Sequence, residues 1–580
     1  RVVSEPSRLP FPIQVGKSPE FFPTPALPAA AALPFHTLLP ALTRLNSHPD
    51  SVALPDAVPT APSPGQSPDT GYAKKVLRGS VWMIANTVAT RIGSFVSQIF
   101  LAWWLTKSDF GIVGIALAIS GIASVLRDGG VRQILLKHHA EHEKLLGPCF
   151  WMALTFNTLL AILLTAAAFP FARLYNDDRL IVMLIIIGWS IPLGTVGGIL
   201  LTKLIADMRY RENASVMTAS AMVRYVSSVA FAYFGFGPLS FILPNILCAL
   251  IENVLALYYC RHRPWQLAPN SNQWWSLFLR SRWALVAALG IAGMNQGSSA
   301  MIGLAAPLEV VGIYAFTFLI VVQVGSLLST NINQVLVPVF TRLADEEDRK
   351  RAAVLRTLRQ VSLLATFMSL GLAATYRPFE SLVWRERWAA SILPVQIIGA
   401  GYAINVLLCI SLAVQQARGQ FRAWGVGLLL LAIGTMLAAY VGTLFGKPEL
   451  DRALFLAMNN PTFWPYVSER VWWSGVYIAL ASAAFGVVSS LLHLTVALKP
   501  LGVGRREVIK NALIVWSLGL LAGALTISID TVADGPVRTN LISLFGHETG
   551  TFFAELLLFI ASRILFTAVY AFLVRTVVPE

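Results

Sequence analysis

Charged residues are scarce in this chain, and their scarcity excludes most soluble architectures. Asp, Glu, Lys and Arg make up 13% of the 580 residues, against roughly 25% in soluble domains, while 56% of the residues are hydrophobic. The apolar stretches recur from about residue 79 to the end of the chain. These features predict an all-α, polytopic membrane protein that is solvated mainly by lipid.

Cysteine and catalytic motifs are also scarce. The four cysteines have unrelated spacings, so no disulfide framework or metal site is expected from Cys149, Cys248, Cys260 and Cys409. The histidine-rich sequence HHAEHEK at 138–144 is interpreted as a solvated loop rather than a metal site. We find no phosphate-binding glycine loop, nucleophile elbow or carboxylate pair. No enzyme activity, cofactor, metal or use of ATP is therefore predicted.

Residues 1–71 differ in composition from the rest of the chain. They hold 15 of the 32 prolines and no apolar run long enough to cross a membrane. Proline at this density prevents regular helices and sheets, so a disordered Pro/Ala-rich tail is expected. A signal peptide is not expected, because no charged start leads into a continuous apolar core. The first methionine of the chain is Met83, so part of this tail is expected to reflect the choice of start site.

Fourteen segments of about 20 residues are candidate membrane spans, beginning at Gly79. Because backbone groups in lipid must be satisfied internally, each is expected to be a helix. The spans are expected near 79–103, 109–126, 148–170, 180–202, 216–234, 238–260, 283–304, 310–333, 357–376, 391–415, 423–446, 472–497, 511–528 and 552–574.

The basic residues between these spans predict an orientation. If residues 72–78 are cytoplasmic, the inner segments carry more than twice as many Lys and Arg as the outer ones. Basic loops remain in the cytoplasm and meet anionic lipid, so both termini are expected there. The net charge of +14 is thus interpreted as a topology signal and not as nucleic-acid binding. The longest outer segment, 447–471, is expected to be an interfacial loop containing a short amphipathic helix.

Two connections in the chain resemble each other. LTKSDFGIVGIALAI follows the first span, and AAPLEVVGIYAFTFL follows the seventh. Each has an acidic residue at the start of a helix and a glycine two or three residues later: Asp109 with Gly111, and Glu309 with Gly312. Because spans 1 and 7 run in the same direction, this pattern indicates a parallel repeat of six helices.

Several ordered motifs resemble a known family. FLAWWLTKSDFGIVGIALAISGIASVLRDGGVRQILLK at 100–137 is similar to the N-terminal signature of Wzx-type polysaccharide flippases, members of the multidrug/oligosaccharidyl-lipid/polysaccharide exporter superfamily. The segments 208–244, 306–323 and 335–349 also resemble that family. Two features depart from it. LAW replaces the usual LAR, and span 7 carries Asn295 and Gln296 where an acidic residue is common, which puts ion coupling through that carboxylate in doubt.

The resemblance implies an architecture. It implies six-helix lobes at 72–263 and 283–498, the second including the outer loop 447–471, joined by a cytoplasmic linker at 264–282. Two extra helices within 499–580 would be peripheral.

The resemblance also implies a function, namely alternating-access transfer of a polyprenyl-pyrophosphate-linked oligosaccharide across the inner membrane. The expected partners are this substrate, membrane lipids and glycan-assembly proteins such as a polysaccharide polymerase, with no nucleic acid, and the protein is expected to be a monomer. The alternatives are a multidrug extruder of the same superfamily, a membrane polysaccharide polymerase or ligase, and a non-transporting scaffold.

Candidate substrate-binding residues are polar groups inside the apolar spans. Arg91 is the leading one, because guanidinium binds two phosphate oxygens at once and because a charge at membrane depth is costly. It lies on a helical stripe with Thr87, Ser94 and Gln98. The alternative is that Arg91 is structural, held by a carbonyl or carboxylate. Asn295 and Gln323, on spans 7 and 8, are further candidates suited to sugar hydroxyls.

Two other arginines lie within spans. Arg224 is a candidate for phosphate binding or for a structural ion pair with Glu252, which lies at a similar number of residues from the turn at 235–237. Arg563 lies in the last span, where pairing with Glu555 or a neighbouring helix is expected rather than substrate contact.

Overall fold

A computed structural model describes residues 87, 89–128, 142–266, 274–342 and 347–577. Within these residues every regular element is helical, and no strand occurs. The predicted tail at 1–71 lies outside the described residues.

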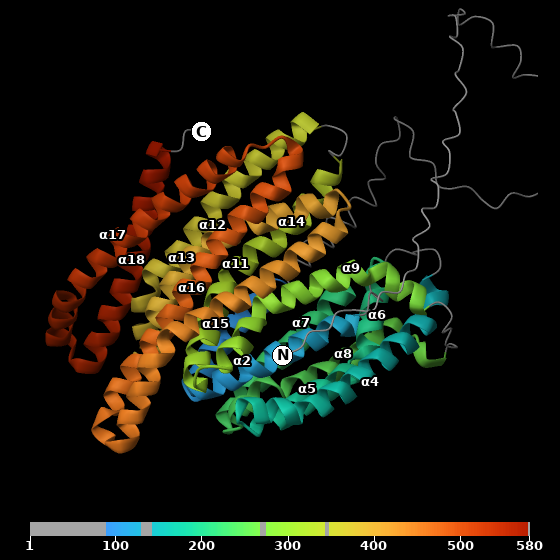
Figure 1. The fold of residues 1–580 in the computed structure, drawn as a ribbon, viewed down its shortest axis with the longest axis horizontal. Helices are drawn as coiled ribbons and strands as arrows, with labels where there is room; N and C mark the ends of the chain where they lie inside the picture. Colours follow the sequence, from blue (N-terminus) through green and yellow to red (C-terminus); the bar gives the residue numbers. More distant parts are fainter. Residues whose placement is uncertain (1–86, 88, 129–141, 267–273, 343–346, 578–580) are drawn as a thin grey trace, which may run out of the picture. The chain divides into compact units, whose positions relative to one another are not determined.

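Each expected span that the structure describes coincides with a helix or a broken helix (Figure 1). The first helix is described over residues 89–104. The helices that follow are α2 (Lys107–Asp128), α4 (His142–Tyr175), α5 (Arg179–Leu193), α6 (Thr195–Ala206), α7 (Tyr210–Tyr233), α8 (Pro244–Cys260), α9 (Trp274–Ala292), α10 (Ser298–Gly303), α11 (Leu308–Arg342), α12 (Glu347–Trp384), α13 (Ile392–Asn405), α14 (Leu408–Ala417), α15 (Phe421–Asn459), α16 (Trp464–Leu498), α17 (Arg505–Phe545) and α18 (His547–Val577).

Many of these helices are long and apolar enough to cross a membrane. In the described part of the chain nine meet both conditions, and α5 with α6, bent by 46° at Gly194, would make a tenth. The protein is therefore an all-α, multi-pass membrane protein, as the sequence predicted. The count of fourteen spans stays a prediction.

Two segments that were expected at the outer surface differ in structure from the sequence expectation. The prediction of an interfacial loop at 447–471 is wrong, because α15 continues to Asn459 and α16 begins at Trp464. Segment 529–551 is likewise helical except for a turn at Gly546, whose φ is +82°. The apolar run ends in both places, but residues such as Leu, Ala, Arg and Glu still favour helix. The end of hydrophobicity therefore did not mark the end of the helix.

The two copies of the sequence repeat lie against each other where α2 and α11 pack. A Cβ placed on Gly111 would lie 2.1 Å from the carbonyl oxygen of Leu308, and one on Gly312 would lie 1.7 Å from that of Lys107. The contact is thus reciprocal, and each glycine leaves room for the backbone of the other copy. Small residues at helix contacts in membranes allow this approach.

An aromatic cluster ties the N-terminal helices to the C-terminal half. The ring of Trp388 stacks on Phe316 with centroids 4.0 Å apart and meets the edge of Phe110. Its indole Nε1 donates a hydrogen bond to the carbonyl of Ala102 at 3.0 Å. Glu380, fully buried, accepts a hydrogen bond from the Trp388 amide at 2.7 Å, which fixes the turn after α12.

Helices α17 and α18 pack against each other and both contact α12. In Figure 1 they run side by side next to α12. Their inner faces bury residues of both helices with Leu370 and Ala374 of α12. This position brings α18 to the edge of a cavity.

Candidate functional site

The polar stripe predicted on the first helix meets Gln323 of α11 in one hydrogen-bond network. Arg91 Nη1 donates to Gln323 Oε1 at 3.2 Å, and Gln323 Nε2 donates to Ser94 Oγ at 2.9 Å. Gln98 Nε2 donates to the same Ser94 oxygen at 3.2 Å. Three predicted site residues of the first helix, Arg91, Ser94 and Gln98, are therefore joined in one network with a fourth, Gln323, which lies more than 220 positions away in the chain.

This network borders a cavity of about 640 Å³, here called the Arg91 cavity. Most of its wall is apolar, and three phenylalanines form a continuous aromatic surface: Phe379 stacks on Phe95 at 6.1 Å and lies 5.7 Å from Phe559. The lining residues are Arg91, Ile92, Phe95, Ile320, Gln323, Met368, Leu372, Thr375, Phe379, Phe559 and Arg563. The cavity thus combines a hydrocarbon-like wall with a few polar groups, as ligand sites commonly do.

Arg563 lines the same cavity, in contrast to its expected peripheral position. Its guanidinium lies over the ring of Phe367 at 5.0 Å and occupies the space left by Gly371, where a Cβ would be 2.2 Å from Nη1. Its expected partner Glu555 instead forms an ion pair with Arg538. The sequence offered one signal for this role, a mid-span arginine, but could not show that α18 lies beside the cavity.

The Arg91 cavity carries positive charge without compensation. None of its lining residues is acidic, and neither Arg91 nor Arg563 forms an ion pair with another residue in the described part of the chain. A cation at membrane depth costs roughly 2.5–3.5 kcal/mol on insertion scales. Two such cations in an apolar wall favour an anionic ligand, and guanidinium suits phosphate oxygens best.

Thr87 and Asn295 belong neither to this hydrogen-bond network nor to the cavity lining. Thr87 lies one helical turn before Arg91, and its carbonyl accepts a hydrogen bond from Thr90 at 3.0 Å. Asn295 is exposed in a π-helical turn, Gly293–Gly297, between α9 and α10. Such turns interrupt helices and are frequent at functional sites. The neighbouring Gln296 faces Gly121 of α2, where a Cβ would be 2.5 Å from its Oε1.

The ion pair proposed between Arg224 and Glu252 is not formed in this structure. Arg224 Nη1 donates to Asn245 Oδ1 at 3.0 Å, and Glu252 Oε1 accepts from Ser220 Oγ at 2.6 Å. Counting residues from the turn explains this, because Ser220, not Arg224, lies as far before it as Glu252 lies after it. Arg224 is exposed and does not line the Arg91 cavity.

We predict that Arg224 is coupled energetically to Asn245 and not to Glu252. In double-alanine cycles on thermal unfolding of the purified protein, Arg224 and Asn245 should show a coupling of about 0.5 kcal/mol, the size typical of exposed pairs. The cycle with Glu252 serves as control and should be additive within about 0.3 kcal/mol. A larger coupling to Glu252 would restore the ion-pair interpretation.

Metal binding finds no support among the described side chains, where no group of three His, Cys, Asp or Glu residues could hold an ion. His138, His139 and Glu141 of the HHAEHEK sequence lie outside the described residues.

The fold and the cavity define a class: a multi-pass helical membrane protein with an arginine-lined, apolar cavity. Residues 100–393, just over half of the chain, match the family described as polysaccharide biosynthesis protein. The chain belongs to this family.

Relatives with assigned names agree with this family. The chain is 23% identical over 329 residues to the succinoglycan biosynthesis transport protein ExoT of Rhizobium meliloti, covering 55% of this chain and 65% of ExoT. It is 24% identical over 339 residues to the lipopolysaccharide biosynthesis protein WzxC of Escherichia coli, covering 56% of this chain and 65% of WzxC. The matched part of the chain thus spans just under two thirds of each of these two relatives.

Solved structures share the fold. The lipid II flippase MurJ in an inward closed conformation matches with a TM-score of 0.56 at 11% identity, covering 85% of this chain and 100% of MurJ. An inward-facing multidrug resistance transporter of the MATE family matches with a TM-score of 0.54 at 10% identity, covering 71% of this chain and 94% of the transporter. At these identities the likeness establishes the fold alone.

Proposed function

We propose that this protein is a flippase that moves a polyprenyl-pyrophosphate-linked oligosaccharide, or a related polysaccharide intermediate, across the inner membrane by alternating access. The observation that carries the proposal is the Arg91 cavity, with two guanidinium groups and no acidic residue in its wall. A lipid-linked glycan has an anionic pyrophosphate next to a long apolar chain. The cavity offers complementary groups for both parts.

In the proposed binding mode the pyrophosphate lies between Arg91 and Arg563. Each guanidinium can donate two parallel hydrogen bonds to phosphate oxygens, which are stronger than bonds to a neutral acceptor. Arg91 would then give up its hydrogen bond to Gln323 Oε1, which frees this oxygen to accept a hydrogen bond from a hydroxyl group of the first sugar. Ser94, beside it, adds a hydroxyl group to the same surface. The apolar chain would follow the aromatic wall.

Several related expectations belong to this proposal. ExoT is named a transport protein and MurJ a lipid II flippase, which supports a transport function in this chain. We infer lobes at 72–263 and 283–498, cytoplasmic termini and a monomer. Thr87, Asn295 and Arg224 would act in a state of the transport cycle other than this one.

The multidrug extruder is the less favoured alternative. Extruders of this superfamily tend to bind cations, and such a ligand requires acidic groups in the wall. The Arg91 cavity has arginines and no acid among its lining residues. A cationic drug would therefore meet like charge in a medium of low dielectric constant, where repulsion is strong.

A reconstitution experiment tests the proposal. Purified protein is placed in liposomes that contain a polyprenyl-pyrophosphate oligosaccharide whose sugar carries a fluorescent label that dithionite reduces to a non-fluorescent product. Dithionite, which does not cross the membrane, is then added outside. Protein-free liposomes should lose only the fluorescence of the outer leaflet. Liposomes with the flippase should lose the signal of both leaflets. Loss restricted to the outer leaflet in the presence of folded protein would overturn the proposed function.

A further inference from the structure

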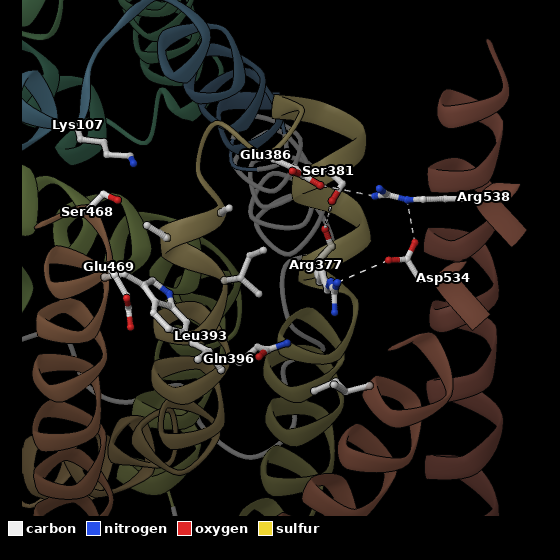
Figure 2. Close-up of a pocket in the computed structure, with 15 residues that line it drawn as sticks. Lys107, Arg377, Ser381, Glu386, Leu393, Gln396, Ser468, Glu469, Asp534 and Arg538 are labelled. Carbon is white, nitrogen blue, oxygen red and sulfur yellow. Dashed lines mark hydrogen bonds and ion pairs between the residues drawn. The ribbon is translucent and has the colours of Figure 1, made fainter. Parts of the chain in front are cut away.

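A second cavity, separate from the substrate site proposed above, lies where α12, α13, α16 and α17 come together with Lys107 of α2. It has a volume of about 750 Å³, within the roughly 300–1,000 Å³ of small-molecule sites. We call it the charged pocket. Figure 2 shows Arg377, Asp534 and Arg538 on one side of it, and Lys107, Ser468 and Glu469 on the other.

The first side of the charged pocket is held by ion pairs. Arg377 Nη2 lies 3.6 Å from Asp534 Oδ2, and Arg538 Nε lies 2.9 Å from Asp534 Oδ1. Arg538 also reaches Glu386 at 3.8 Å and pairs with Glu555 of α18. In these contacts two guanidinium groups face three carboxylates, and the ion pairs join α12, α17 and α18. They therefore form a rigid polar wall.

The other side of the charged pocket has polar groups without partners. Lys107, Gln396 and Glu469 form no ion pair or side-chain hydrogen bond with another residue that the structure describes. The indole of Trp472 lies beside them, with its ring 4.9 Å from that of Trp473. An ammonium, an amide and a carboxylate together offer both donors and acceptors to a ligand.

The charge balance of the pocket indicates the chemistry of its ligand. Its lining contains three basic and three acidic side chains, namely Lys107, Arg377, Arg538, Glu386, Glu469 and Asp534. Neither an anion such as phosphate nor a cation is favoured by such a lining. A ligand rich in hydroxyl groups is favoured, because each hydroxyl both donates and accepts. The aromatic face of Trp472 suits the C–H surface of a sugar ring.

The position of the pocket agrees with such a ligand. Its residues come from four segments that the distribution of Lys and Arg places at the outer surface: near 107, 377–396, 468–472 and 527–538. We propose that the charged pocket binds the oligosaccharide head group after it has reached the outer side. The identity of this glycan with the transported one rests on the proposed function, whereas glycan binding itself does not.

A cysteine-protection experiment tests this inference. All four native cysteines are buried, so Cys introduced by Ser468→Cys, at an exposed position in the pocket lining, should be the thiol that reacts with a bulky maleimide. Ser543→Cys is the matched control, exposed on α17 but outside the pocket lining. One probe is oligosaccharide released by mild acid from the lipid-linked pool of the producing cells. The other is the intact lipid-linked pool in nanodiscs.

We expect both probes to slow labelling severalfold in Ser468→Cys and to leave Ser543→Cys unchanged. Adding Glu469→Gln or Gln396→Ala to Ser468→Cys should remove the protection while the protein elutes as a folded monodisperse species. The inference is overturned if neither probe protects Ser468→Cys, or if both introduced cysteines are protected equally. Protection that survives both added substitutions overturns it too.

The same proteins distinguish this inference from the proposed function. Protection by the free glycan together with no dithionite-accessible lipid transfer would leave the pocket in place and remove the flippase. Lipid transfer without protection of the cysteine would support the flippase and overturn glycan binding in the charged pocket. Protection by the lipid-linked pool but not by the released glycan would mean that the lipid portion is bound instead, which contradicts the inference.

Discussion

Substituting alanine for Gly312 is expected to destabilise the folded protein by about 3 kcal/mol or more, because the added methyl group has no space. Its Cβ would lie 1.7 Å from the carbonyl oxygen of Lys107, and that atom belongs to backbone, which cannot rotate away. Helices α2 and α11 would have to separate. The reciprocal change, Gly111→Ala, should have a similar effect, since its Cβ would lie 2.1 Å from the carbonyl of Leu308.

Thermal unfolding of the protein in detergent, followed by intrinsic fluorescence and by size-exclusion recovery after heating, measures this effect. Gly198→Ala in α6 is the control, because nothing lies within 4 Å of the added Cβ. That change should be neutral or stabilising by up to about 1 kcal/mol, as alanine favours helix over glycine. A midpoint for Gly312→Ala equal to that of wild type would mean that α2 and α11 are not in close contact.

Replacing Arg91 with glutamine is expected to lower the rate of lipid-linked glycan transfer at least about tenfold. Loss of a hydrogen bond to a charged group costs about 1.5–3 kcal/mol, and each 1.4 kcal/mol corresponds to a factor of ten. Arg91→Lys should retain part of the rate, because lysine keeps the charge but loses the forked donors. The dithionite assay in liposomes measures these rates.

Arg452→Gln is the matched control for Arg91→Gln. Arg452 is exposed in α15 and lines neither cavity, so removing its charge should leave the rate unchanged. Wild-type transfer by folded Arg91→Gln would show that Arg91 is a structural residue held by Gln323. A stability loss without a change in rate per folded molecule would support the same conclusion. Arg563→Gln, tested in parallel, reports on the second guanidinium of the cavity.

The positions of the helices were predicted from the sequence better than the contacts between them. Hydropathy located the helices, and the repeated acidic residue and glycine identified the two segments whose backbones meet at Gly111 and Gly312. Both signals are local. The contact of Arg91 with Gln323 joins residues 232 positions apart, and periodicity carries no information about which helix faces which. The two residues were each predicted as candidates, but their network was not.

Arg563 and Arg224 also show that the sequence does not predict contacts between helices. Arg563 was expected to be peripheral because α17 and α18 follow the repeated helices in sequence, yet their packing on α12 brings this side chain to the cavity. One of the two roles predicted for Arg224, an ion pair with Glu252, came from a count of residues that ignored a difference of four, about one turn of helix. Packing partners and depth both require coordinates.

Helix α12 separates the two cavities, and successive turns of it contribute to both. Thr375 and Phe379 face the Arg91 cavity, while Arg377 and Ser381 face the charged pocket. The helix is therefore a wall common to two cavities, one proposed to bind an anion and the other proposed to bind an uncharged glycan. A ligand that shifts α12 when it binds in one cavity would change the affinity of the other cavity for its own ligand. By thermodynamic linkage, the second ligand would change the affinity for the first by the same factor.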